Sequence, residues 1–335
     1  MFSKKICIDL GTANTVVYTP ENGVVFEEPT VLSIADKTKE IIAIGKDAKL
    51  MLGKVADDIT AKRPLQHGVI ANFKLTEKFL TYCIGIANKG NSRFFKPLVL
   101  LSAPAGITSV EERAIIEAAL NAGAGKVYLL PEPIAAGIGA GLPISSSTGH
   151  MIVNIGGGTS EIAIISVNSI CCFKSEKVAG DFLNEKIVQY MKKKYNVLIG
   201  EQLAENIKKI IGSAVPLAKP FEMEFRARDA SNSSPKTIRI NSNDMVDAIT
   251  PALQLIAKGI VEVLDKAQPE LASDVLDRGM ILAGGSANLR NIDEYFATVI
   301  GIPAHIADDP IHCVIRGLAT AVDNLDALSR ALKTS

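Results

Sequence analysis

The sequence lacks an excess of charge of either sign. Its 335 residues include 36 Lys and Arg and 36 Asp and Glu, so the formal net charge is zero. Proteins that bind nucleic acids in general normally carry a basic excess, and the balanced composition argues against that class. A neutral chain repels copies of itself only weakly, which suits self-association.

Long apolar runs are also absent. The sequence has no run of about 18 uncharged apolar residues, the length needed to span a bilayer. Residues Met1 to Lys5 lead directly into a predicted strand, without the apolar segment and cleavage site of a signal peptide. We therefore expect a cytoplasmic protein, or one that is at most peripheral to a membrane. The content of 47% hydrophobic residues is ample for the cores of about two domains.

The spacing of Cys, His and Gly residues excludes several common metal- and nucleotide-binding motifs. The five Cys and four His are scattered without a CxxC pair or a zinc-ligand pattern, so reduced thiols are expected. No G-x-x-x-x-G-K-[ST] segment occurs, which excludes a P-loop. Gly137, Gly139 and Gly141 lack the G-x-G-x-x-G spacing and follow a Pro-Glu-Pro turn, so they are predicted to pack helices.

Two similar glycine-rich turns are the most informative features that are present. The first lies in Ile8–Thr15 and the second in Val153–Ser160. Each reads as an apolar strand, a polar residue, a glycine turn with Thr, and a second β-rich strand. Such a hairpin directs several backbone N–H groups into one concavity, which suits phosphate. Two copies in separate halves predict a duplicated fold that grips one polyphosphate from both sides.

A third glycine turn follows the apolar strand Met280–Ala283. It begins with Gly284 and Gly285, and paired glycines after a buried strand let a flat ring or a ribose approach the backbone closely. In this order and spacing, the three turns resemble the phosphate 1, phosphate 2 and adenosine motifs of the actin-like ATPase superfamily.

The alternation of elements predicts an α/β fold. Strand, helix and strand alternate between Leu98 and Leu130, which indicates parallel strands, and the second half of the chain repeats the plan. We expect an actin-like fold with two duplicated α/β domains, each with a smaller subdomain, around a nucleotide cleft. Helices are predicted over 76–87, 109–122, 242–266 and 312–332, with Thr76, Ser109, and Ser242 or Asn243 as N-caps of the first three.

The same pattern predicts the domain boundaries. Domain I comprises residues 1–143 and 310–335, with a small insertion at about 34–69. Domain II comprises residues 144–309, with an insertion at about 181–242.

Further segments resemble one family within the superfamily, MreB, over nearly the whole chain. The similar segments are Ile8–Thr15, Arg63–Pro64, Gly68–Ala71, Pro104–Thr108, Glu132–Ala136, Gly139–Pro143, Ile199–Glu201, Ala204–Lys208 and Arg316–Gly317. MreB is the bacterial actin homologue that forms nucleotide-dependent, double, membrane-bound filaments. The resemblance therefore implies a homopolymer of paired protofilaments on the inner face of the cell membrane, together with related filament proteins as further partners and no nucleic acid.

The resemblance also implies which residues bind ATP or ADP with Mg²⁺. The expected nucleotide-binding residues are Thr12, Ala13, Asn14, Gly156, Gly157, Gly158, Glu205, Asn206, Ile207, Lys208, Gly284, Gly285, Ser286 and Ala287. Asp9 and Asn154 would hold Mg²⁺ through water, and Glu132 and Thr159 would position the water that attacks ATP. The alternatives are that Asp9 caps its turn and that Glu132 is only a carboxylate at a helix N-terminus.

Three positions depart from the family pattern. Asn154, Asn72 and His67 stand where acids are usual in the family. At position 154 the amide keeps the shape of an acid but loses its charge, and it offers one acceptor oxygen and an NH₂ donor. This predicts a divergent paralogue that binds nucleotide and hydrolyses it slowly.

Two adjacent aromatic residues, Phe94 and Phe95, lie between Arg93 and Lys96 in a predicted loop. Aromatic side chains at the lipid interface with cations at the headgroups would form a membrane-inserting tip, and the MreB family uses this loop in that way. The alternative is a pair of aromatics half-buried against the domain.

Three functions remain open for this fold: a cytoskeletal filament protein, a sugar or acetate kinase, and a chaperone-type ATPase. Kinases of this fold need a second substrate pocket, and chaperones carry a further peptide-binding domain. The insertions here are small and the chain ends at Ser335, soon after the last nucleotide motif. We therefore predict a filament protein with weak ATPase activity that supports cell shape or motility.

Overall fold

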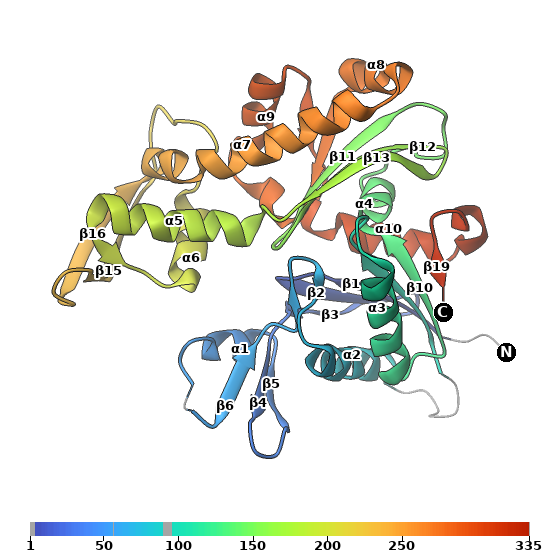
Figure 1. Cartoon of the computed structure of the whole chain (residues 1–335), viewed down its shortest axis with the longest axis horizontal. Helices are drawn as coiled ribbons and strands as arrows, with labels where there is room; N and C mark the ends of the chain where they lie inside the picture. The colour runs from blue at the N-terminus through green and yellow to red at the C-terminus, as the bar shows by residue number, and fades with distance from the viewer. Residues whose placement is uncertain (1–3, 56, 90–95, 335) are drawn as a thin grey trace.

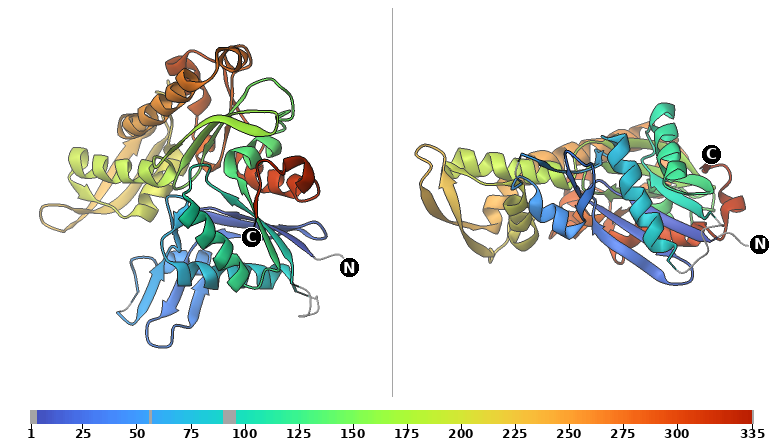
Figure 2. Two further views of the ribbon diagram at one scale, coloured as in Figure 1. Left: turned by 45° about the vertical axis from the view of Figure 1, so that its right-hand side comes forward. Right: turned by 90° about the horizontal axis from the view of Figure 1, so that it is seen from below.

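Two central β-sheets, with helices on and between them, form the body of the protein (Figure 1). The computed structural model describes residues 4–55, 57–89 and 96–334. Each sheet carries a smaller unit, and both small units lie on the same side of the molecule, away from the last strand (Figures 1 and 2). The two halves also line a common cavity, which is described below.

The first sheet has the strand order β19-β10-β9-β1-β2-β3. Strand β1 pairs antiparallel with β2 and parallel with β9, and β9 pairs parallel with β10. The strands are β1 (Lys5–Leu10), β2 (Asn14–Thr19), β3 (Gly23–Pro29), β9 (Leu98–Ala103), β10 (Lys126–Pro131) and β19 (Lys333–Thr334).

The second sheet repeats this plan in the order β13-β12-β11-β17-β18. Strand β11 is antiparallel to β12 and parallel to β17, as β1 is to β2 and β9. The strands are β11 (His150–Ile155), β12 (Ser160–Ser166), β13 (Ser169–Glu176), β17 (Met280–Ala283) and β18 (Ala304–Ile306). The predicted α/β class and duplication are confirmed.

Helices α2 and α3 cover the first sheet and α7, α8 and α9 the second, whereas α5 and α6 lie beside the second small unit (Figure 1). Buried apolar residues form a separate core for each half. The helices of the first half are α2 (Phe73–Ala87) and α3 (Ser109–Asn121), and those of the second are α5 (Gly180–Tyr195), α6 (Glu201–Ile211), α7 (Ser242–Lys266), α8 (Pro269–Arg278) and α9 (Ile292–Ile300).

The small units differ in composition. In the first half, β4, β5 and β6 form a sheet with a short helix; in the second, β14, β15 and β16 form a sheet beside α5 and α6. The elements are β4 (Leu32–Ala35), β5 (Ile41–Ile44), α1 (Lys46–Met51), β6 (Ile59–Lys62), β14 (Val197–Leu198), β15 (Glu222–Asp229) and β16 (Pro235–Asn241). A short hairpin of β7 (Leu65–Gln66) and β8 (Val69–Ile70) returns to the cleft.

Two helices cross between the sheets, α4 (Glu132–Gly139) and α10 (Cys313–Ala321). A β-carbon added to Gly139 would lie 1.8 Å from the carbonyl oxygen of Cys313, and one added to Gly317 would lie 1.8 Å from that of Ala135. Only glycine permits this approach at both points. The helices share an apolar cluster with residues of both sheets, so this crossing joins the two halves.

The structure corrects the predicted helix starts. The N-caps of α2, α3 and α7 are Asn72, Thr108 and Asn241, and not Thr76, Ser109, and Ser242 or Asn243. Each true cap is a polar residue from one to four positions earlier whose side chain accepts a hydrogen bond from a first-turn N–H group, so the local sequence offered several candidates.

The predicted last helix is also too long. The helix ends at Ala321, and a 3₁₀ turn (Leu325–Leu328) and β19 follow it. Among the described residues, no helix combines the length and apolar character needed to cross a membrane.

Candidate nucleotide-binding site

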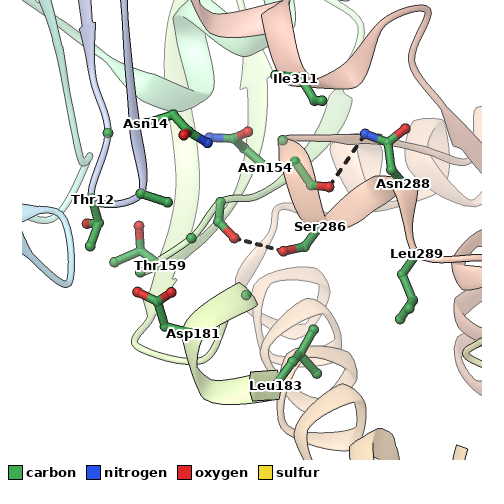
Figure 3. Close-up of a pocket in the computed structure, with 18 of the residues that line it drawn as sticks. Thr12, Asn14, Asn154, Thr159, Asp181, Leu183, Ser286, Asn288, Leu289 and Ile311 are labelled. Carbon is green, nitrogen blue, oxygen red and sulfur yellow. Dashed lines mark hydrogen bonds between the residues drawn. The ribbon is translucent and has the colours of Figure 1, made fainter. Parts of the chain in front are cut away.

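A cavity of about 330 Å³ lies between the two halves, at the ends of β1 and β11 (Figure 3). Residues of all three predicted glycine turns line it, together with the first turn of α5 and one face of α6. The predicted site residues that line it are Asp9, Thr12, Ala13, Asn14, Glu132, Asn154, Gly156, Gly157, Gly158, Thr159, Glu205, Lys208, Gly284, Gly285 and Ser286.

The two phosphate turns approach each other so closely that glycine is required. A β-carbon on Gly157 would lie 2.4 Å from the β-carbon of Ala13. One on Gly158 would lie 2.6 Å from Oγ1 of Thr12. The turns therefore face each other across one small space, as the duplicated motifs predicted.

Thr12 also ties the first turn to the β7–β8 hairpin. Its Oγ1 accepts a hydrogen bond of 2.8 Å from the backbone N–H of Gly68. Gly68 has a φ of +76°, and a β-carbon there would lie 2.7 Å from Cγ of Pro104. The hairpin thus closes the phosphate end of the cavity from the first small unit.

The third turn packs against the second phosphate turn. Gly284 has a φ of +85°, and an added β-carbon would lie 2.4 Å from the carbonyl oxygen of Ile155. Ser286 donates a hydrogen bond of 2.9 Å from Oγ to the carbonyl of Gly156 (Figure 3). In contrast, no described atom lies within 4 Å of a β-carbon built on Gly285, which faces open space.

The start of α5 forms another wall. The N–H of Gly180 donates to the carbonyl of Gly156 at 3.1 Å, and the N–H of Asp181 donates to that of Gly157 at 2.8 Å. From α6, Nζ of Lys208 donates to the carbonyl of Gly180 at 2.7 Å. Burial lowers the pKa of Lys208 to about 8. The ammonium group beside the cavity therefore loses its proton more easily than an exposed lysine would.

Three predicted nucleotide-binding residues do not reach the cavity wall. On α6, Asn206 is exposed and Ile207 is buried in the core, because neighbouring positions on a helix point in different directions. Ala287 is also buried in the core. Glu205 and Lys208, three residues apart, share the face that lines the cavity.

Acidic groups gather at the base of the cavity. Ser102 donates a hydrogen bond of 2.8 Å to Oδ1 of Asp9, but desolvation raises the pKa of this Asp to about 6. Desolvation, followed by the charges of Glu161 and Asp9, raises the pKa of Glu132 well above its ordinary value. Burial and the neighbouring acids thus disfavour the ionised form of Glu132.

Asn154 contacts one of these acids. Its Nδ2 donates a hydrogen bond of 3.4 Å to Oε2 of Glu132. Its Oδ1 is buried and has no hydrogen-bond partner among the described residues. A buried acceptor without a partner is costly, so this oxygen is available to a ligand group in the cavity.

These groups fit a hydrated Mg²⁺ ion. Among the described residues, no group of three His, Cys, Asp or Glu side chains could hold a metal ion. However, Mg²⁺ in nucleotide sites keeps several waters and is bound by one or two carboxylates and the phosphates. Asp9 and the free oxygen of Asn154 supply acceptors of that kind.

Sequence reasoning missed several wall residues. Glu27 and Ile311 reach the cavity from β3 and from the turn before α10, and Asp181, Leu183 and Asn184 reach it from α5. The predicted membrane residues Phe94 and Phe95 lie outside the described part of the chain.

Comparisons with known sequences identify a family. The family described as MreB/Mbl protein matches residues 3–330. The chain is 44% identical to the cell shape-determining protein MreB of Escherichia coli K12 over 330 residues, which cover 97% of this chain and 95% of the relative. It is 40% identical to the cell shape-determining protein Mbl of Bacillus subtilis over 98% of this chain and 99% of that relative.

Solved structures agree with the sequence relatives. MreB5 of Spiroplasma citri bound to AMPPNP has a TM-score of 0.93 at 36% identity, over 98% of this chain and 99% of that one. A MamK double helical filament, at 19% identity, has a TM-score of 0.76 over 95% and 99% of the two chains, which shows the shared fold. The predicted actin-like fold is confirmed, and the chain belongs to the MreB/Mbl family.

Proposed function

We propose that this protein is an actin-like cytoskeletal protein that binds ATP in the cavity between its halves and assembles into filaments. The main support is the convergence of the two phosphate turns, with Gly157 against Ala13 and Gly158 against Thr12. Structures of MreB5 of Spiroplasma citri bound to AMPPNP and to ADP, both 36% identical, lend further support.

The two phosphate turns would hold the phosphates, and the third turn with α6 would hold the nucleoside. Backbone N–H groups of the turns are suited to phosphate oxygens. At the other end, open space at Gly285 leaves room for a base, while Glu205 supplies acceptors for ribose hydroxyls. When bound, Mg²⁺ would neutralise phosphate charge beside Asp9 and Asn154.

Hydrolysis is proposed to be slow. Glu132 and Thr159 both line the cavity beside the phosphate turns, where they would orient a water molecule. A general base must accept a proton, and the raised pKa of Glu132 opposes ionisation before ligand binds. The amide of Asn154 also leaves one negative charge fewer near the phosphates than an acid would supply.

Filament assembly is the second part of the proposal. MamK, which shares the fold, forms a double helical filament. The relatives MreB and Mbl reported above are named cell shape-determining proteins. The predicted division into domain I (1–143 and 310–335) and domain II (144–309) gives two rigid parts whose closure around nucleotide would favour assembly. None of the relatives reported above is a kinase or a chaperone.

Sedimentation with ATP and Mg²⁺, with ADP and Mg²⁺, and without nucleotide tests this function. Pelleting that depends on ATP and protein concentration is expected. A protein that stays in the supernatant under all conditions, although it binds ATP, would refute the filament role.

We also propose that the polymers bind the inner face of the cell membrane through Phe94 and Phe95. Each fully buried aromatic contributes roughly 1.5–3 kcal/mol, which is marginal for one protomer but is repeated along a filament. Liposome co-sedimentation of wild type and a Phe94→Ser, Phe95→Ser variant under polymerising conditions tests the attachment. If the variant pellets equally with lipid, these residues are not the anchor.

A further inference from the structure

Charged contacts join the two small units across the mouth of the nucleotide cavity. Nζ of Lys49, on α1, lies 2.7 Å from Oε2 of Glu205, on α6. The guanidinium of Arg63, just after β6, lies 2.6 Å from Oδ2 of Asp181 and 3.0 Å from Oε1 of Glu201. In Figure 1 the unit that contains α1 lies directly opposite α6.

The Lys49 contact is reinforced by the backbone. Nε2 of Gln202, one turn before Glu205, donates a hydrogen bond of 2.7 Å to the carbonyl of Lys49. Nζ of Lys209 lies 2.7 Å from Oε1, the other carboxylate oxygen of Glu205. The side chain of Glu205 is 19% exposed, and although burial alone would raise its pKa, the hydrogen bonds from Lys209 and Lys49 lower it to about 2.

Both contacts end on residues that line the cavity. Glu205 lies at the nucleoside end of the cavity wall, and Asp181 is the residue whose N–H donates to the second phosphate turn at Gly157. Lys49 and Arg63 belong to the other half of the molecule and do not line this cavity. Each therefore acts on the site through a residue of the opposite half.

We propose that Lys49 is a positioning residue of the nucleotide site. It fixes the carboxylate of Glu205 for the ribose and, with Arg63, fastens the small units together, so that a bound nucleotide leaves only after these contacts open. This inference rests on the proposed nucleotide binding. The contacts of Lys49 and Arg63 at the mouth of the cavity would therefore slow the dissociation of the nucleotide.

The chain offers a matched control on the same helix. Lys46 is also on α1 and pairs with Glu28 at 3.4 Å, but Glu28 belongs to the same half and the Lys46 side chain is 75% exposed. Removal of Lys46 changes the net charge as removal of Lys49 does, without loosening the cleft. Lys49→Arg keeps the positive charge and a side chain long enough to contact Oε2 of Glu205, so it should restore the wild-type behaviour.

The test measures dissociation of a fluorescent ATP analogue by displacement with excess ATP, at protein concentrations below those that pellet. Lys49→Met should release the analogue about two- to fivefold faster than wild type, as expected for loss of one partly exposed ion pair, and Arg63→Met, which loses its pairs with Asp181 and Glu201, should do so at least as fast. Lys46→Met and Lys49→Arg should match wild type. High salt should reduce the difference between wild type and Lys49→Met, because it screens the contact.

Melting temperatures of the unliganded variants verify that each is folded. Equal dissociation rates for Lys49→Met and Lys46→Met would overturn the inference while leaving nucleotide binding intact, and so would failure of Lys49→Arg to restore the rate. If wild type binds no analogue at all, the proposed function fails and the inference fails with it.

Discussion

Asn154 donates a hydrogen bond from Nδ2 to Oε2 of Glu132 and leaves its own Oδ1 without a partner among the described residues. The pair joins β11 of one half to the start of α4 at the base of the cavity. The amide holds Glu132 without adding a negative charge beside it, so the bond stabilises the site.

We predict that Asn154→Asp lowers the stability of the unliganded protein and raises its Mg²⁺-dependent ATP turnover. The new carboxylate adds negative charge beside Glu132, whose pKa burial and neighbouring acids already raise, and a bound cation would offset that charge. Thermal melting without ligand and phosphate release with ATP and Mg²⁺ measure the two effects. An unchanged melting temperature and an unchanged rate of phosphate release would show that the amide at position 154 affects neither stability nor turnover.

Glu132→Gln should lower phosphate release by about 10²–10⁴-fold with little change in ATP affinity, because a neutral amide cannot accept the proton of the attacking water. The matched control is Glu117→Gln, which removes an exposed carboxylate from α3. Phosphate release by Glu132→Gln at the rate of this control would exclude Glu132 from catalysis.

Gly317→Ala should destabilise the protein by about 2–3 kcal/mol, because the new methyl group would overlap the carbonyl of Ala135 where α4 and α10 cross. Gly85→Ala, in α2, meets no described atom within 4 Å and should instead add about 0.5–1 kcal/mol. Urea unfolding of both variants measures the difference. Equal effects would mean that the helices do not cross this closely.

A pH effect is expected at His312, whose ring nitrogens lie 2.7 Å from Asp309 and 3.1 Å from Glu27. Burial alone would lower its pKa, but the hydrogen bonds to Asp309 and Glu27 raise it above 6.5. Its stabilising contribution is therefore complete below pH 6.5 and is lost as the pH rises through the higher folded-state pKa.

The melting temperature of wild type should accordingly exceed that of His312→Gln by more at about pH 6 than at about pH 9. His305→Gln, which changes an exposed histidine on β18, is the control. A difference that does not vary with pH would contradict the assignment of charge to His312.

The sequence was sufficient to predict what depends on local pattern. Glycine turns after apolar strands marked residues that line the cavity, and the duplicated order of strands followed from the repeated motif. The i,i+3 spacing of Glu205 and Lys208 also identified the correct face of α6. The contiguous stretch from Glu205 to Lys208 was too broad, because a helix turns Asn206 and Ile207 away.

Contacts between distant segments could not be predicted in this way. Lys49 and Glu205 are separated by 156 positions, and nothing in either local sequence indicates that they meet. The caps of α2 and α3 were misplaced for a different reason, because Thr76 and Ser109, in the first turns of these helices, have the same capping chemistry as the true caps. The structure alone selects Asn72 and Thr108.

The central claim is that nucleotide binds between the two phosphate turns, and a calorimetric titration of AMPPNP with Mg²⁺ tests it most directly. Wild type should bind at one site, and so should Gly200→Ala, whose added methyl group meets no described atom within 4 Å. Gly157→Val should abolish binding, because its side chain would collide with Ala13 and force the two turns apart; the melting temperature verifies that the variant is folded. A folded Gly157→Val protein that binds with wild-type affinity would contradict the account.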